Sequence, residues 1–183
     1  MSKFKHKITV IGDGFVGKTS LITKFTQGGF QEEYIKTIGA QFSEYIEERD
    51  GDRWELFFWD IAGQDEFHFL RPAFYRSSVA SIIVFSLEEN DLGRNSFKHV
   101  TDWCKEIKKF CGEIPIILFG NKVDLVDESK LDDQKILKLV NKNNFIDYYH
   151  TSAKTGQNVE EAFKTIIEEL QNKYKEKKLV QNP

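Results

Sequence analysis

The stretch from Thr9 to Leu21 reads TVIGDGFVGKTSL and contains the residue types needed to hold a phosphate chain. Within it, the segment GDGFVGKT fits the pattern G-x-x-x-x-G-K-[ST], between an expected strand and an expected helix. Glycines let the backbone turn with positive φ, so that the N–H groups of the loop face an anion at the positive end of a helix. Lys18 adds a mobile positive charge for the terminal phosphates, and Thr19 offers a hydroxyl to Mg²⁺. A turn that merely uses glycine is the alternative, but the strand–loop–helix context favours a phosphate loop whose contacting residues are Gly14, Phe15, Val16, Gly17, Lys18, Thr19 and Ser20.

Two further polar loops indicate which base the nucleotide carries. Asn121, Lys122 and Asp124 follow the apolar run IPIILFG, so they are expected at the carboxyl end of a parallel strand, where ligands bind in such sheets. The Asp124 carboxylate accepts hydrogen bonds in a fork, which suits the N1–H and the exocyclic amine of guanine, whereas adenine presents an acceptor there. In HTSAKTG, after the last weak strand, the Ala153 N–H could meet guanine O6, while the aliphatic stem of Lys122 covers one base face. NKVD alone is a common polar loop, but the loops together predict guanine.

The elements that must position these loops alternate between strands and helices. Buried strands are expected at KITVIG, LFFWDI, ASIIVFSL, IPIILFGN and, more weakly, FIDYYHTS, with amphipathic helical segments between them. The segment AQFSEYIEERDGDRWELFFWD differs, because it alternates and then breaks at Asp50–Gly51, a two-residue hairpin signal. The pattern predicts an α/β fold with an open, mostly parallel sheet and one antiparallel edge strand.

Length and composition exclude several classes of protein. A chain of 183 residues suits one domain, and a net charge of −3 gives no basic field that would draw it to nucleic acid. No apolar run is long enough for a transmembrane helix, and the N-terminus lacks the apolar segment of a secretory signal. Cys104 and Cys111 are expected as reduced thiols on one helix, which agrees with a cytoplasmic protein.

These motifs, in this order, carry a resemblance to a known family. The blocks GDGFVGKTS, YIKTIGAQF, WDIAGQDEF, NKVD and TSAK occur in sequence, and between Lys7 and Lys173 the chain resembles a small GTPase of the Ras superfamily, most similar to the Rab family. The resemblance implies a three-layer P-loop NTPase fold, with helices on both faces of a six-stranded sheet. It also implies a GTP-binding and GTP-hydrolysing molecular switch with a role in membrane traffic or related signalling.

The same resemblance assigns roles to residues around the nucleotide. It implies that Phe30 contacts the guanine, that Tyr34 covers the phosphates, and that Gly63 touches the γ-phosphate through its N–H. It implies Mg²⁺ coordination by Thr37 and, through water, by Asp60, beside Thr19. The base-binding loop that it implies contains Ser152, Ala153 and Lys154.

Gln64 matches the glutamine that orients the attacking water, and Gly14 matches the glycine that leaves room for it. No arginine stands in the segment before Thr37, where a built-in arginine finger would be expected, so we expect slow intrinsic hydrolysis and an activating protein that acts in trans. The alternatives are a nucleotide-binding interaction module with negligible hydrolysis and, less favoured because of NKVD, an ATP-using kinase or transport ATPase.

Residues 28–39 and 61–77 are expected to be the moving switches, which effectors, exchange factors and GTPase-activating proteins read. In the Rab-like pattern, Phe42, Trp59 and Phe74 form an apolar patch between the switches, although core packing is the plain alternative. Several features depart from the family: Ile61 instead of threonine, Asp65–Glu66 after the glutamine, and Pro72 inside an expected helix, which should break or shorten it.

The C-terminal segment departs most from the Rab pattern. No cysteine follows Cys111, so prenylation is not expected. We therefore expect no direct membrane anchor in this chain, and membrane association only through a missing tail or a partner. We also expect the protein to be a monomer. We expect a small GTPase domain at residues 1–175 and a short frayed tail at residues 176–183.

Overall fold

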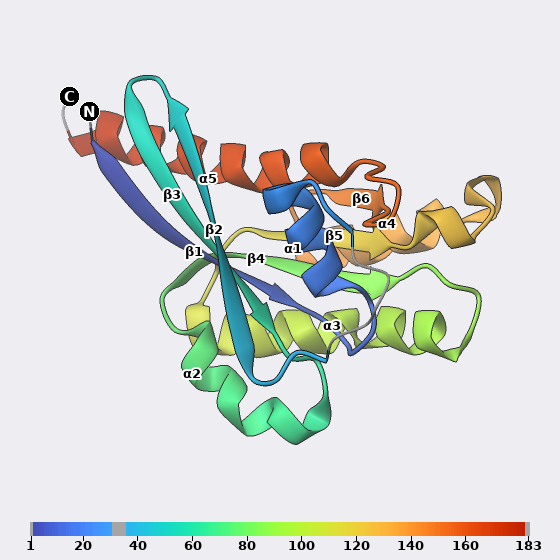
Figure 1. Ribbon diagram of the computed structural model, residues 1–183. Helices are drawn as coiled ribbons and strands as arrows, with labels where there is room; N and C mark the ends of the chain where they lie inside the picture. The colour runs from blue at the N-terminus through green and yellow to red at the C-terminus, as the bar shows by residue number, and fades with distance from the viewer. Residues whose placement is uncertain (1, 31–35, 182–183) are drawn as a thin grey trace.

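The computed structural model describes residues 2–30 and 36–181, which form one sheet with helices on both faces (Figure 1). The six strands are β1 (Lys3–Ile11), β2 (Ala40–Arg49), β3 (Asp52–Ile61), β4 (Ser78–Ser86), β5 (Ile116–Asn121) and β6 (Tyr148–Thr151), in the order β2-β3-β1-β4-β5-β6. All neighbouring pairs are parallel except β2 with β3, so the predicted fold class is confirmed.

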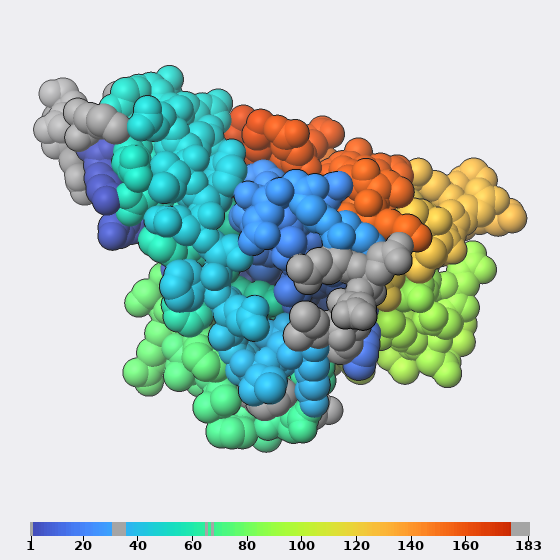
Figure 2. All heavy atoms as spheres, in the orientation of Figure 1, coloured from blue at the N-terminus to red at the C-terminus, as the bar shows by residue number. Residues whose placement is uncertain are grey.

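The central strands β4 and β5 are buried because helices cover both faces of the sheet there, whereas the edge strand β2 is mostly exposed. In β4, Ile82 and Val84 pack into one core and Ile83 and Phe85 into the other, since successive side chains of a strand point to opposite faces. The first core contains residues of α1 (Lys18–Gln27) and α5 (Val159–Gln181). The second contains residues of α2 (Arg71–Tyr75), α3 (Asp91–Cys111) and α4 (Asp133–Asn143). Figure 2 shows α1 in the middle of one face, between the β2–β3 hairpin and the region of α4.

Local sequence sets the ends of several elements. The hairpin between β2 and β3 turns at Asp50 (φ 55°) and Gly51 (φ 78°), as the sequence predicts. Helix α3 begins after Asn90, whose side chain accepts a hydrogen bond from the Gly93 N–H at 3.0 Å. Pro72 lies in the first turn of α2, where its missing N–H costs nothing, and a 3₁₀ segment (Asp65–Leu70) precedes this five-residue helix. The expected shortening at Pro72 is therefore observed.

Two 3₁₀ turns, Val123–Leu125 and Glu128–Lys130, connect β5 to α4. Helix α5 (Val159–Gln181) is the last element of the chain. It ends beside the β2–β3 hairpin, where the Lys175 ammonium lies 2.6 Å from the Asp50 carboxylate. This contact joins the last helix to the edge of the sheet.

Glu55 of β3 provides a test of the electrostatics of the sheet. Its buried carboxylate lies 2.6 Å from Lys3 Nζ, 3.0 Å from Arg53 Nε and 3.5 Å from Lys5 Nζ. The hydrogen bond from Lys3, with a second from Arg53, lowers the pKa of Glu55 from 4.5 to about 2. A depressed pKa in the folded state means that the carboxylate stabilises the fold above pH 4.5 and that this stabilisation is lost as the pH falls through about 2.

We therefore expect Glu55→Gln to lower the melting temperature at neutral pH, with a difference from the wild type that shrinks between pH 5 and pH 2. Thermal unfolding followed by circular dichroism across this range measures the difference. The exposed Glu44→Gln on β2 is the control and should change the melting temperature little at any pH. A Glu55→Gln deficit that stays constant down to pH 2 would contradict the charge-based explanation.

Candidate functional site

A cavity of about 470 Å³ opens at the carboxyl ends of the parallel strands. Such a position is expected for a ligand in an open α/β sheet. Its lining consists of Gly14, Phe15, Gly17, Lys18, Thr19, Ser20, Thr23, Phe30, Thr37, Ala62, Gly63, Gln64, Asn121, Lys122, Asp124, Leu125, Ala153 and Lys154. Nearly all the residues that the sequence singled out for a nucleotide thus meet at one place.

The loop between β1 and α1 can take its path only because of its glycines. Gly12 has φ 137°, and a Cβ there would lie 2.1 Å from the Val84 carbonyl oxygen. Gly17 has φ 95°, and its Cβ would lie 2.3 Å from Asn121 Nδ2. The Asn121 amide donates a hydrogen bond to the Val16 carbonyl oxygen at 2.8 Å, so the loop is fastened to the end of β5. Val16 does not line the cavity but holds the loop in place.

Lys18 brings a buried positive charge to this loop. Its side chain is 6% exposed, and Nζ donates to the carbonyl oxygens of Gly12 at 2.9 Å and of Asp13 at 2.7 Å. Burial lowers the pKa of Lys18 to about 8, against the opposing influence of Asp60 and Asp13. An anion in the cavity would favour the charged ammonium, which is the electrostatic requirement for a phosphate site.

Three oxygen-bearing side chains converge beside Lys18. The Thr19 hydroxyl donates to Asp60 Oδ2 at 2.5 Å, and the Thr37 hydroxyl donates to the same oxygen at 3.3 Å. Asp60 is 3% exposed, burial raises its pKa, and within the described part of the chain Oδ1 has no hydrogen-bond partner. A buried carboxylate with an unpaired oxygen beside two hydroxyls is an all-oxygen set of the kind that Mg²⁺ prefers, so these residues fit the metal.

Gln64 and Gly14 lie next to each other in the lining of the cavity. A Cβ on Gly14 would lie 3.3 Å from Gln64 Cγ, so the glycine gives the glutamine side chain its room. A Cβ on Gly63 would lie 2.1 Å from the Gly12 carbonyl oxygen, so the segment after β3 touches the loop after β1 directly.

The loops expected to bind the base are joined by hydrogen bonds. Asp124 Oδ1 accepts from the Ser152 hydroxyl at 2.6 Å, and Asn121 Oδ1 accepts from the Ala153 N–H at 3.2 Å. Ser152 is fully buried and therefore orients Asp124 instead of lining the cavity. Phe30 also belongs to the lining of the cavity, and Tyr34 falls outside the described residues.

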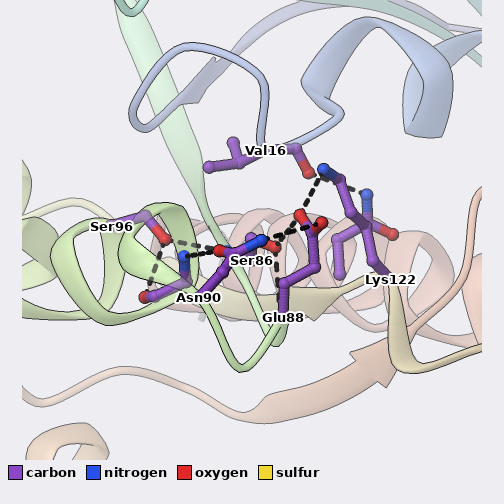
Figure 3. A network of polar contacts seen from close by, with 8 residues as sticks. Val16, Ser86, Glu88, Asn90, Ser96 and Lys122 are labelled. Carbon is purple, nitrogen blue, oxygen red and sulfur yellow. Dashed lines mark hydrogen bonds and ion pairs between the residues drawn. The ribbon is translucent and has the colours of Figure 1, made fainter. Parts of the chain in front are cut away.

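Glu88, on the loop between β4 and α3, was not found by sequence reasoning. Its carboxylate lies 2.6 Å from Lys122 Nζ and accepts from Ser86 Oγ at 2.8 Å and from Asn90 Nδ2 at 3.2 Å (Figure 3). Burial opposes ionisation of Glu88, but the hydrogen bonds from Lys122 and Ser86 hold its pKa below the usual value. Glu88 therefore fixes the side chain of Lys122 beside the cavity. Sequence reasoning also gave no role to Thr23, Ala62 and Leu125, although Ala62 lies within the block WDIAGQDEF.

The aromatic side chains expected between the switches form one cluster. The ring centroids of Phe42 and Trp59 are 5.7 Å apart, and those of Trp59 and Phe74 are 6.2 Å apart. Phe42 is 62% exposed, and Lys7 Nζ lies 3.9 Å from the centroid of the Trp59 ring. Trp59 and Phe74 are half-buried, so the cluster combines packing with an exposed apolar surface.

Comparisons with known proteins agree with this geometry. The family model described as the Ras family matches residues 7–172. The chain is 36% identical to the human Ras-related protein Rab-21 over 168 residues, which is 91% of this chain and 72% of that protein. It is 33% identical to the Ras-related protein Rab-13 of Canis lupus familiaris over 165 residues, with 90% and 79% covered. A Rab-21 from the sponge Geodia cydonium is 32% identical over 167 residues, with 91% and 71% covered. Within the part of the chain that the structure describes, no helix has the length and apolar character of a membrane span.

The contact between Glu88 and Lys122 yields a prediction for nucleotide release. We expect Glu88→Gln to accelerate GDP dissociation on the order of fivefold, because Lys122 loses an ion pair worth about 1 kcal/mol and its stem, expected to cover the base, would be held less firmly. Release of a fluorescent GDP analogue measures the rate. The adjacent, exposed Glu89→Gln is the matched control and should leave it unchanged. Equal rates for the two variants would show that Glu88 does not support the base site.

Proposed function

This chain belongs to the Ras family and is a GTPase, a Rab-like molecular switch, and from that premise we propose that its GTP and GDP states depend on Mg²⁺ and are read by partners through residues 28–39 and 61–77. The observation that supports this best is the single cavity in which the phosphate loop, the oxygen cluster around Asp60 and the loop of Asp124 meet. Family membership makes guanine nucleotide the ligand and suggests a role in membrane traffic. The GTPase domain is proposed to span residues 1–175.

We assign the nucleotide contacts as follows. Asp124 pairs with the N1–H and amine of guanine, the Ala153 N–H meets O6, and Lys122 and Phe30 flank the base. The N–H groups of residues 14–20 and the Lys18 ammonium surround the phosphates. Mg²⁺, held by Thr19, Thr37 and the buried Asp60, would neutralise the negative charge of the β- and γ-phosphates. Tyr34, Gly63, Ser152 and Lys154 complete the proposed site.

In the reaction, water attacks the γ-phosphorus, a P–O bond forms to the water oxygen, and the bond to the bridging oxygen of GDP breaks. We propose that the Gln64 side chain orients this water, while Lys18 and the loop N–H groups stabilise the charge that develops on the phosphate oxygens. Both protons of the water leave with the inorganic phosphate, as H₂PO₄⁻. Positioning of the water and electrostatic stabilisation account for the rate enhancement, because the protein forms no covalent bond to the substrate.

Intrinsic hydrolysis is proposed to be slow. Residues 28–36 contain no arginine that could act as a finger within the chain. By the family resemblance, the missing side chain at Gly14 leaves room for Gln64 and for an arginine supplied by an activating protein. The Phe42, Trp59 and Phe74 cluster lies between the proposed switches and is exposed at Phe42, so it is proposed as the surface that effectors contact.

Base selectivity tests the proposed role of Asp124. Asp124→Asn should weaken GDP binding and shift preference toward xanthosine diphosphate, since the amide donates to the extra carbonyl of xanthine where the carboxylate accepted from the guanine amine. Competition binding with GDP, XDP and ADP measures the preference. Asp127→Asn, outside the cavity, is the control and should retain the wild-type order. Comparable affinity of the wild type for ADP and GDP would contradict the role assigned to Asp124.

Hydrolysis tests the proposed role of Gln64. Gln64→Leu should slow single-turnover GTP hydrolysis on the order of tenfold while GDP affinity stays nearly unchanged, because the glutamine acts on the water and not on the ground-state nucleotide. The exposed Gln134→Leu on α4 should behave as the wild type. A Gln64→Leu rate equal to the wild-type rate would show that another group positions the water. Negligible wild-type hydrolysis, even with an activating protein, would favour the interaction-module alternative.

A further inference from the structure

A buried arginine lies between the loop of Gln64 and helix α3. We propose that Arg71, held by Trp103 and Glu106 of α3, is a positioning residue that sets where Gln64 stands against the γ-phosphate. This inference rests on the proposed function, because it takes Gln64 to orient the attacking water.

Arg71 contacts the backbone of the residue that it positions. Its Nη2 donates to the carbonyl oxygens of Gly63 and of Gln64, at 3.1 Å each. The side chain of Arg71 is 6% exposed, so these bonds are shielded from competing water. Because they fix two consecutive carbonyl groups, they fix the orientation of the backbone from which the Gln64 side chain starts.

Secondary structure contributes little to fixing the backbone at Gln64. Gln64 has φ −77° and ψ 146°, an extended conformation, and the 3₁₀ segment Asp65–Leu70 follows it. The helix after that segment, α2, has only five residues. Segments this short have few internal hydrogen bonds and are not stable alone. The position of Gln64 therefore depends on side-chain anchors such as Arg71.

The guanidinium of Arg71 is itself held on two sides by α3. Its central carbon lies 4.3 Å from the centroid of the Trp103 ring, a cation–π geometry. Its Nη1 lies 3.5 Å from Glu106 Oε2, and Glu106 Oε1 accepts from the Tyr75 hydroxyl at 2.9 Å. Burial raises the pKa of Tyr75, so this hydroxyl remains a donor. A buried cation needs such partners, and their geometry leaves Arg71 little freedom.

Trp103 is oriented in turn by the phosphate loop. Its indole Nε1–H donates to Asp13 Oδ1 at 2.7 Å, and the other oxygen of Asp13 lies 2.7 Å from His99 Nδ1. Asp13 directly precedes Gly14, the residue next to the Gln64 side chain. The contacts thus run from the phosphate loop through Asp13, Trp103 and Arg71 to the backbone of Gln64. The path ties the position of the glutamine to the loop that holds the phosphates.

The experiment measures single-turnover GTP hydrolysis, dissociation of a fluorescent GDP analogue and melting temperature for Arg71→Met and Trp103→Phe. A displacement of a reacting group by about 1 Å can cost on the order of 100-fold in rate, so we expect Arg71→Met to slow hydrolysis about tenfold and Trp103→Phe several-fold. The GDP dissociation rate should change less than about twofold in both, since neither residue lines the cavity. Trp103→Phe keeps an aromatic ring but removes the indole donor and part of the ring, and it decides the question if Arg71→Met does not fold.

Matched controls come from the same chain. Arg94→Met removes an exposed arginine of α3 that pairs with Asp91, and Trp54→Phe alters a buried indole near the start of β3. Both should hydrolyse GTP at the wild-type rate. Their melting temperatures separate loss of stability from loss of positioning.

The decisive readout is coupling to Gln64. If Arg71 acts through the glutamine, then Arg71→Met and Trp103→Phe should each add less than about twofold to the defect of Gln64→Leu. Full multiplication of the defects would overturn the inference. The inference would be overturned if Arg71→Met and Trp103→Phe both hydrolysed GTP at the wild-type rate while Gln64→Leu hydrolysed it more slowly. The proposed function would then still stand. An unchanged rate for Gln64→Leu itself would instead refute the proposed role of the glutamine.

Discussion

The buried side chain of Asn121 is the interaction on which the rest of the site depends. It is 1% exposed at the end of β5, donates to the Val16 carbonyl oxygen at 2.8 Å and accepts from the Ala153 N–H at 3.2 Å. One amide therefore joins the loop proposed for the phosphates to the loop proposed for the base. Since Gly17 has no Cβ, the loop can approach this amide closely. Parallel strands bring these loops to one edge of the sheet, and the amide fixes the distance between them.

The site keeps buried charges that the fold does not fully satisfy. Lys18 faces backbone carbonyl groups, burial lowers its pKa to about 8, and burial raises the pKa of Asp60. Such groups cost stability in a protein without ligand. A ligand that supplies a complementary anion and a cation removes that cost and binds only the folded state, so binding and stability are linked. The buried charges that select the ligand of the cavity also make the stability of the folded protein depend on whether that ligand is bound.

Side chains, more than secondary structure, hold the segments around the phosphates. Arg71 holds the backbone at Gln64 through buried contacts with α3. In contrast, the ion pair between Lys36 and Glu66 joins residues 28–39 to residues 61–77 at the surface. Exposed ion pairs contribute little to stability. The buried anchor and the exposed ion pair suit the switches proposed for these segments, which would be ordered in one nucleotide state and released in the other.

The sequence by itself determined the sheet, the hairpin at Asp50–Gly51 and the loops that meet at the cavity. Those features are encoded locally, in glycines with positive φ, in apolar runs and in short motifs that directly follow strands. Tertiary structure alone decided the pairing of Glu88 with Lys122 and the path from Asp13 through Trp103 to Arg71. These contacts join residues far apart in the chain, and no periodicity or spacing marks them, because only the packing of α3 and the loops against the sheet brings their side chains together.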